Sequence, residues 1–188
     1  GYYNIGYVYF AQGDYSKALE YFEEVLKIRL SVYGENHSRV ASVYNDIGEI
    51  YSVQGDDFKA LDYFKKSLKI VLSVYGENHS QVSSIYDHIG EIYFAQKDYS
   101  KALYYFEESL KIRLSLFGEN HPEVALSYYS IGSLYIIQGD KSKALNYYEK
   151  SLKIRLSVYG ENHPLTKEIM DLINVANSKV LQSPETTK

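Results

Sequence analysis

Gly34-Glu35-Asn36-His37 is a four-residue sequence that returns unchanged at Gly76–His79, Gly118–His121 and Gly160–His163. Each copy lies 42 residues after the previous one. Self-similarity at a period of about 20 to 50 residues is typical of solenoids, in which each unit buries its apolar face against its neighbours. The period therefore predicts a repeat array, and such arrays are binding surfaces far more often than catalysts.

The composition excludes several classes of protein. The 188 residues are 45% hydrophobic and 23% charged, which are globular values, and the formal net charge is −4. This acidic balance lacks the basic footprint of a nucleic-acid binder. No apolar run approaches the roughly 18 residues that a membrane span needs. The chain has no cysteine and no signal-peptide pattern, so we expect an intracellular, cytoplasmic protein without nucleic-acid or membrane partners.

Each repeat predicts two helices. In the unit from Ser38 to His79, apolar residues at helical spacing predict a first helix from about Arg39 to Gln54. Gly55-Asp56 ends that helix and caps a second one, which runs from Asp57 to about Tyr75. The sequence therefore predicts an all-α fold of four antiparallel helix pairs followed by one last helix.

The small and aromatic residues of this unit match a known signature. The aromatic, Leu-Gly, Tyr, Gly, Ala and aromatic positions of the tetratricopeptide repeat (TPR) are here Tyr44, Ile47-Gly48, Tyr51, Gly55, Ala60 and Phe64. The signature recurs in the other units. The chain thus resembles a TPR array, and its 42-residue form is similar to the repeats of kinesin light chains. The resemblance implies a right-handed superhelical α-solenoid, whose first helices line a concave groove.

Two expectations concern packing inside the repeats. The signature predicts that Gly48 and Ala60 let paired helices approach closely, with Tyr51, Phe64, Tyr93 and Phe106 buried among them. Lys97 replaces the turn glycine of the third unit, from which we expect that this turn does not require a positive φ.

The two ends of the chain differ. We expect four repeats over residues 1–163, a C-terminal capping helix over 164–181 and a disordered tail over 182–188. The capping helix keeps a single apolar stripe, consisting of Ile169, Met170, Ile173, Ala176 and Val180. The chain opens inside a first helix, so the first repeat is truncated and we expect a fragment of a longer protein. Its uncapped N-terminal edge offers a surface for self-association.

Catalysis and metal binding are not expected. The loop histidines are His37, His79, His121 and His163, which occupy equivalent places one repeat apart. Helix layers lie roughly 8–10 Å apart, whereas zinc holds each ligand at about 2.0–2.1 Å. We therefore expect these histidines to begin helices. Without cysteine, a phosphate-binding loop or an unrepeated Ser/His/Asp set, the sequence predicts neither an enzyme nor a cofactor.

The second helices carry charges in an order that supports helix formation. Glu23 precedes Lys27, Glu107 precedes Lys111 and Glu149 precedes Lys153, each by four residues. We interpret these charges as a solvated convex face.

The first helices give the sharpest functional indication. Their candidate groove residues are Tyr3, Tyr7, Phe10, Asn45, Asp46, Glu49, Ser52, Asp87, His88, Glu91, Phe94, Tyr129, Ser133 and Ile136. These helices hold five acidic residues against a single base, Arg39. An acidic, aromatic groove is suited to a protein partner that presents a peptide with basic and apolar side chains. The basic groove of kinesin light chains, which reads acidic motifs, is not implied here. A structural spacer or self-association array within a larger protein remains the alternative.

Overall fold

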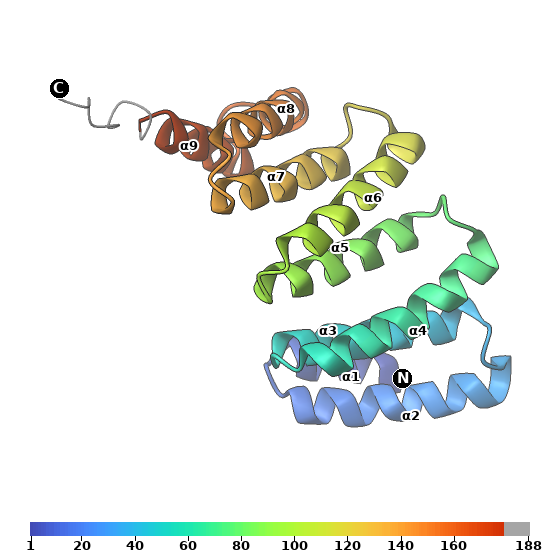
Figure 1. The fold of residues 1–188 in the computed structure, drawn as a ribbon. Helices are drawn as coiled ribbons and strands as arrows, with labels where there is room; N and C mark the ends of the chain where they lie inside the picture. The colour runs from blue at the N-terminus through green and yellow to red at the C-terminus, as the bar shows by residue number, and fades with distance from the viewer. Residues whose placement is uncertain (179–188) are drawn as a thin grey trace, which may run out of the picture. The chain divides into compact units, whose positions relative to one another are not determined.

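The structure is a computed structural model that describes residues 1–178 (Figure 1). Within that range the chain forms nine α-helices and no strand. The helices are α1 (Tyr2–Ala11), α2 (Tyr15–Tyr33), α3 (Ser38–Val53), α4 (Asp57–Tyr75), α5 (Ser80–Ala95), α6 (Tyr99–Phe117), α7 (Pro122–Ile137), α8 (Lys141–Tyr159) and α9 (Pro164–Ser178). The expected end of the capping helix at Leu181, its apolar Val180 and the tail lie outside the described residues.

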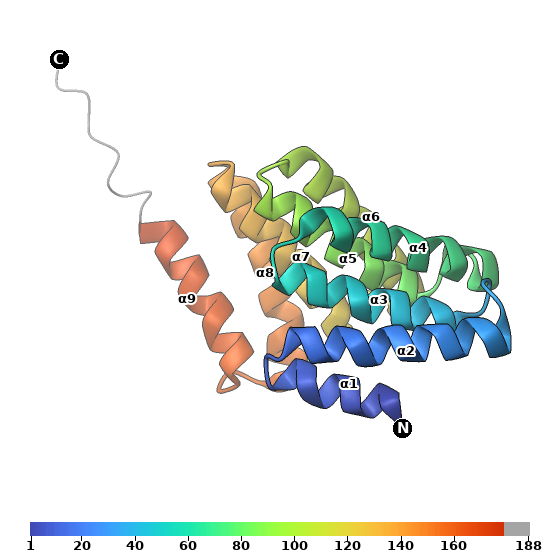
Figure 2. The same ribbon diagram turned by 90° about the horizontal axis from the view of Figure 1, so that it is seen from below.

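The helices belong to two compact units, Gly1–Asp98 and Tyr99–Lys188. In the first unit each helix from α1 to α4 packs on the helix that follows it, and Figure 2 shows α1, α2 and α3 side by side. In the second unit α6 packs on α7, α7 on α8, and α8 on α9. Packing between successive helices is what a repeat array requires, and the predicted all-α repeat fold is confirmed.

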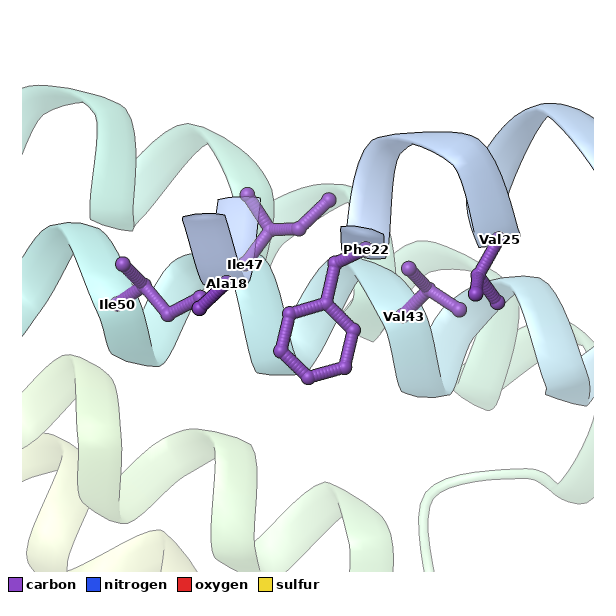
Figure 3. Packing of buried hydrophobic residues seen from close by; sticks show 6 residues of the cluster. All are labelled: Ala18, Phe22, Val25, Val43, Ile47 and Ile50. Atoms are coloured by element: carbon purple, nitrogen blue, oxygen red, sulfur yellow. The ribbon is translucent and has the colours of Figure 1, made fainter. Parts of the chain in front are cut away.

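The core of the first unit is built by facing apolar stripes. Ala18, Phe22 and Val25 of α2 meet residues of α3, and Figure 3 shows the cluster of Ala18, Phe22, Val25, Val43, Ile47 and Ile50. Each of these side chains is at most 6% exposed. The 3.6-residue spacing places them on one face of each helix, so the repeat buries its apolar side chains against the next repeat.

Small residues permit the close helix contacts that the sequence predicts. A Cβ atom added to Gly48 would lie 2.9 Å from the Phe64 ring, and one added to Gly132 would lie 2.6 Å from the Tyr148 ring. Ala60, on the same helix as Phe64, is fully buried. An alanine at either glycine would therefore force the opposing ring to move.

Burial of the four aromatic residues follows the prediction only for the phenylalanines. Phe64 is 1% exposed and Phe106 is 4% exposed. Tyr51 and Tyr93 are half-buried instead. The Tyr51 ring stacks on that of Tyr63, which is itself half-buried, with 5.6 Å between centroids.

Each loop histidine caps the helix that follows it, as predicted. His37 Nδ1 accepts a hydrogen bond from Arg39 N at 3.1 Å, and His79, His121 and His163 accept equivalent bonds at 3.2 Å. Each imidazole also stacks on the aromatic ring four residues earlier, with centroids 4.2–4.6 Å apart. The sequence analysis did not predict this stacking, which joins each loop to the end of the preceding helix.

The expectation for Lys97 is wrong, because this residue adopts a φ of +63°. The glycines at the same turn in the other repeats, Gly13, Gly55 and Gly139, have φ between +77° and +82°. The turn geometry is therefore kept and the lysine conforms to it. The left-handed conformation brings the Cβ of a non-glycine residue close to the following carbonyl oxygen, which costs about 1–2 kcal/mol.

Replacing Lys97 with glycine is therefore expected to raise the free energy of unfolding by about 0.5–1 kcal/mol. The gain is smaller than the strain because glycine loses more backbone entropy on folding. Chemical denaturation of the two proteins measures the difference. Lys65→Gly, an exposed substitution inside α4, is the control and should destabilise the protein by about 1 kcal/mol. A Lys97→Gly protein that is as unstable as this control would contradict the strain argument.

Two surface ion pairs differ from the prediction. Lys27 Nζ contacts Glu24 at 2.6 Å and Lys111 Nζ contacts Glu108 at 3.7 Å, so each lysine pairs with the acid three residues before it instead of four. Both spacings bring side chains together on a helix surface.

Among the described residues, no helix combines the length and apolar character that crossing a membrane requires.

Candidate functional site

A polar pocket of about 230 Å³ opens among four helices of the first unit. Its lining comes from α1, α3, α4 and α5, and consists of Tyr3, Ser42, Asn45, Asp46, Ser67, Val71, Gln81, Ser84 and Ile85. Tyr3, Asn45 and Asp46 are among the residues predicted for the groove. The repeat pattern brings them together because first helices of successive repeats, α1, α3 and α5, contribute equivalent faces.

Asp46 is the most enclosed acid of the candidate set. It is 7% exposed, and its carboxylate accepts hydrogen bonds from Tyr3 Oη at 2.7 Å and Tyr7 Oη at 2.6 Å. Burial raises the pKa of Asp46, against the lowering effect of the two phenol bonds and of the Arg29 charge. Burial, followed by its hydrogen bonds with Asp46 and Tyr3, raises the pKa of Tyr7. Tyr3 and Tyr7 of α1 thus cover the Asp46 carboxylate.

A second hollow, of about 160 Å³, lies along the same helices and is lined by Phe10, Glu49, Ser52, Val53, Phe64, His88 and Glu91. We call it the aromatic hollow. His88 lies with its ring centroid 5.0 Å from that of Phe64, and its Nε2 is 3.9 Å from Glu49 Oε1. Asn45 Nδ2 donates to Glu49 Oε1 at 2.6 Å. The lining of the aromatic hollow thus includes five predicted groove residues: Phe10, Glu49, Ser52, His88 and Glu91.

The carboxylates of the aromatic hollow are less acidic than their residue type indicates. Burial, followed by the charge of Asp46, raises the pKa of Glu49 to about 7. Burial and the charge of Asp87 raise the pKa of Glu91. Counting formal charges therefore overstates the negative charge at neutral pH, where Glu49 is only partly ionised. A nearby cation would favour ionisation of Glu49.

The remaining predicted residues are spread over two helices. Asp87 and Phe94 are half-buried on α5. In the second unit, Tyr129 Oη donates to Glu168 at 3.1 Å, and Ser133 Oγ accepts from Tyr148 Oη at 3.2 Å. Ile136 is 37% exposed on the same helix as these two residues.

Arginines of the second helices were missed by the sequence analysis. Arg113 and Arg155, each 4% exposed, do not lie on a solvated convex face. Arg113 Nη1 donates to Ser127 Oγ at 2.8 Å, and its Nη2 lies 2.9 Å from Glu123. The available signal was the recurring Lys-Ile-Arg-Leu, in which arginine follows an apolar residue at a fixed place in the repeat.

No cluster of three or more metal-ligating side chains occurs within residues 1–178. Carboxylates, amides and aromatic rings line the polar pocket and the aromatic hollow.

Several solved structures have a similar fold. BtubC (BKLC) from P. vanneervenii superposes with a TM-score of 0.77 at 20% identity, over 97% of this chain and 81% of that one. A kinesin light chain-like protein of P. anserina with nearly identical TPR-like repeats gives a TM-score of 0.74 at 15% identity, over 97% and 95% of the two chains. The apo form of RapI gives 0.81 at 18% identity, over 96% of this chain and 63% of RapI.

Sequence comparison supplies the family. No curated protein matches the chain. The profile of the Tetratricopeptide repeat family, however, matches residues 1–72, 39–115 and 82–157, which together span most of the sequence. The chain belongs to the tetratricopeptide repeat family, in a 42-residue form whose fold is that of kinesin light chain-like repeats.

Proposed function

We propose that this repeat array is a scaffold that binds a peptide segment carrying basic and apolar side chains, on the surface formed by its first helices. Tetratricopeptide repeats are typically non-enzymatic scaffolds for protein–protein interaction. The observation that carries the finer proposal is the aromatic hollow, where Glu49 and Glu91 stand beside the rings of Phe10 and Phe64.

The charge balance of the aromatic hollow supports a cationic ligand. Within the first unit, the ion-pairing partner of Glu49 is an imidazole, His88 Nε2 at 3.9 Å, rather than a lysine or arginine. A lysine or arginine of a peptide would supply the missing counter-charge, and its aliphatic stem would pack on the aromatic rings. An acidic peptide would instead add like charge to carboxylates that already repel one another.

Charge reversal tests this proposal. The double variant Glu49→Lys/Glu91→Lys is expected to weaken binding of cationic-apolar peptides at least tenfold, or about 1.4 kcal/mol. It replaces attraction by repulsion at both carboxylates. A peptide array identifies the ligands, and titration at two salt concentrations measures their affinity. Binding to the wild type should also weaken with salt, because exposed charges are screened beyond about 8 Å at physiological ionic strength.

The matched control is Glu20→Lys/Glu23→Lys, which makes the same change of charge at two exposed residues of α2. Equal affinities for the wild type and the first-helix variant would refute the proposal. So would equal losses in both variants, since only the net charge would then matter. A chain that binds no peptide but forms dimers by light scattering would favour the alternative, a structural or self-association array.

A further inference from the structure

We propose that the polar pocket receives the guanidinium group of an arginine from the bound peptide. This inference rests on the proposed function and names one side chain that the ligand would present. It concerns a different place from the aromatic hollow, although both lie along α3 and α5.

One position of the second helix differs between repeats. Arg29, Arg113 and Arg155 occupy this position in the first, third and fourth repeats, 42 or 84 residues apart. In the second repeat the residue is Val71, which lines the pocket. The pocket therefore lies where the other repeats have an arginine.

The first and last repeats show how that arginine is held. Arg29 Nη1 donates to Arg39 O at 2.6 Å, and Arg155 Nη1 donates to Leu165 O at 2.6 Å. In both cases the acceptor lies ten residues after the arginine. Ten residues after Val71 stands Gln81, which also lines the pocket.

The same two arginines each cover an aromatic ring of their own repeat. The guanidinium carbon of Arg29 is 4.3 Å from the Tyr3 ring centroid, and that of Arg155 is 5.0 Å from the Tyr129 centroid. The equivalent residue in the second repeat is Asn45. The second repeat therefore has Val71 in place of the arginine and Asn45 in place of the tyrosine that the arginine covers.

Two side chains of the pocket lining, Asn45 and Gln81, carry hydrogen-bond acceptors without donors. Asn45 Oδ1 and Gln81 Oε1 are buried and have no hydrogen-bond partner. An unpaired buried acceptor is costly, so native structures seldom keep one. The Asp46 carboxylate lines the same pocket and adds negative charge.

These surroundings favour a guanidinium over other groups. It carries five N–H donors in a planar fork and no acceptor, so it can serve several separate oxygens at once. An ammonium group offers the same charge from a single point. A neutral urea group has a similar shape, but it brings an acceptor and no charge.

The first experiment titrates the wild-type chain with three small probes, the acetylated amides of arginine, lysine and citrulline. Nuclear magnetic resonance follows the side-chain amide signals of Asn45 and Gln81. The arginine probe is expected to shift both signals and to bind at least tenfold more tightly than citrulline. Equal binding of arginine and citrulline, or shifts that avoid both amides, would overturn the inference. Stronger binding of lysine would also reject it in its guanidinium form.

The second experiment supplies the guanidinium from the chain itself. In Val71→Arg the new side chain should occupy the pocket, abolish the effect of the arginine probe and keep the midpoint of thermal unfolding at or above that of the wild type. Val74→Arg, at a 43% exposed position three residues later on α4, adds the same charge and should leave probe binding unchanged. Unchanged probe binding in a folded Val71→Arg protein contradicts the proposal, and if this variant fails to fold, the probe titration decides alone.

The two proposals can fail separately. Cationic peptides that bind Val71→Arg as tightly as the wild type, yet bind Glu49→Lys/Glu91→Lys poorly, would leave the proposed function standing without the arginine pocket. If the arginine probe binds in the pocket but the chain binds no peptide, the arginine pocket would stand and the proposed function would fail.

Discussion

Replacing Phe64 with alanine is expected to lower the free energy of unfolding by about 3–5 kcal/mol, the range for truncating a buried aromatic side chain. Phe64 is 1% exposed, packs against Gly48 and lies beneath the aromatic hollow. Removing its ring leaves a cavity between α3 and α4 that neither helix can close without losing other contacts. Urea denaturation followed by circular dichroism measures the change.

Phe58→Ala is the matched control, because Phe58 lies on the same helix and is 84% exposed. Its cost should stay near 0.5 kcal/mol, as at most surface positions. Similar costs at the two phenylalanines would mean that the helix register of the second repeat is misassigned.

The affinity for a cationic peptide is expected to fall by roughly 10- to 30-fold between pH 8 and pH 5.5. The cause is Glu49, whose pKa is raised to about 7, so that roughly nine-tenths of it is ionised at pH 8 but only about 3% at pH 5.5. A bound cation favours the ionised carboxylate and lowers its pKa, so binding releases a proton. Affinity is therefore highest above pH 7 and is lost as the pH falls through this value. Isothermal titration at several pH values measures both the affinity and the proton release.

Glu49→Gln separates this effect from other titrating groups near the hollow, which include Asp46, Glu91 and His88. The variant should bind more weakly than the wild type at pH 8 and show a much flatter pH profile. A wild-type affinity that does not change with pH would show that Glu49 does not face the ligand's charge. An unchanged profile in Glu49→Gln would assign the dependence to one of the other groups.

The sequence predicts the helices well because their signals are local. Glycine stops, aspartate caps and a 3.6-residue apolar spacing occur within each unit, and α4 begins and ends at the predicted residues, Asp57 and Tyr75. The family signature also identifies the close contact at Gly48. A prediction from one residue type fails at Lys97. The geometry of the repeated turn imposes a positive φ there, against the backbone preference of lysine.

The candidate site is less predictable because it depends on contacts between repeats. Helical spacing cannot reveal that α1 covers Asp46 with two tyrosine hydroxyls, or that burial shifts the pKa of Glu49. It also cannot show that an arginine of a second helix reaches the neighbouring first helix. Such features depend on residues about 10 to 43 positions apart. A comparison of equivalent positions between repeats would have pointed to Val71, whereas the charge count of the first helices could not.

The stacked histidine caps have a consequence for how such a chain can change length. The stacking and capping contacts of the connection, from Tyr33 through His37 to Arg39, lie within seven consecutive residues. These two contacts therefore depend on local sequence alone. When a gene gains or loses 42 codons by recombination between equivalent positions of two repeats, the connection at the new junction keeps its complete sequence. Unequal recombination would then lengthen or shorten the array in whole steps, and new specificity could evolve by altering single positions within a copied unit.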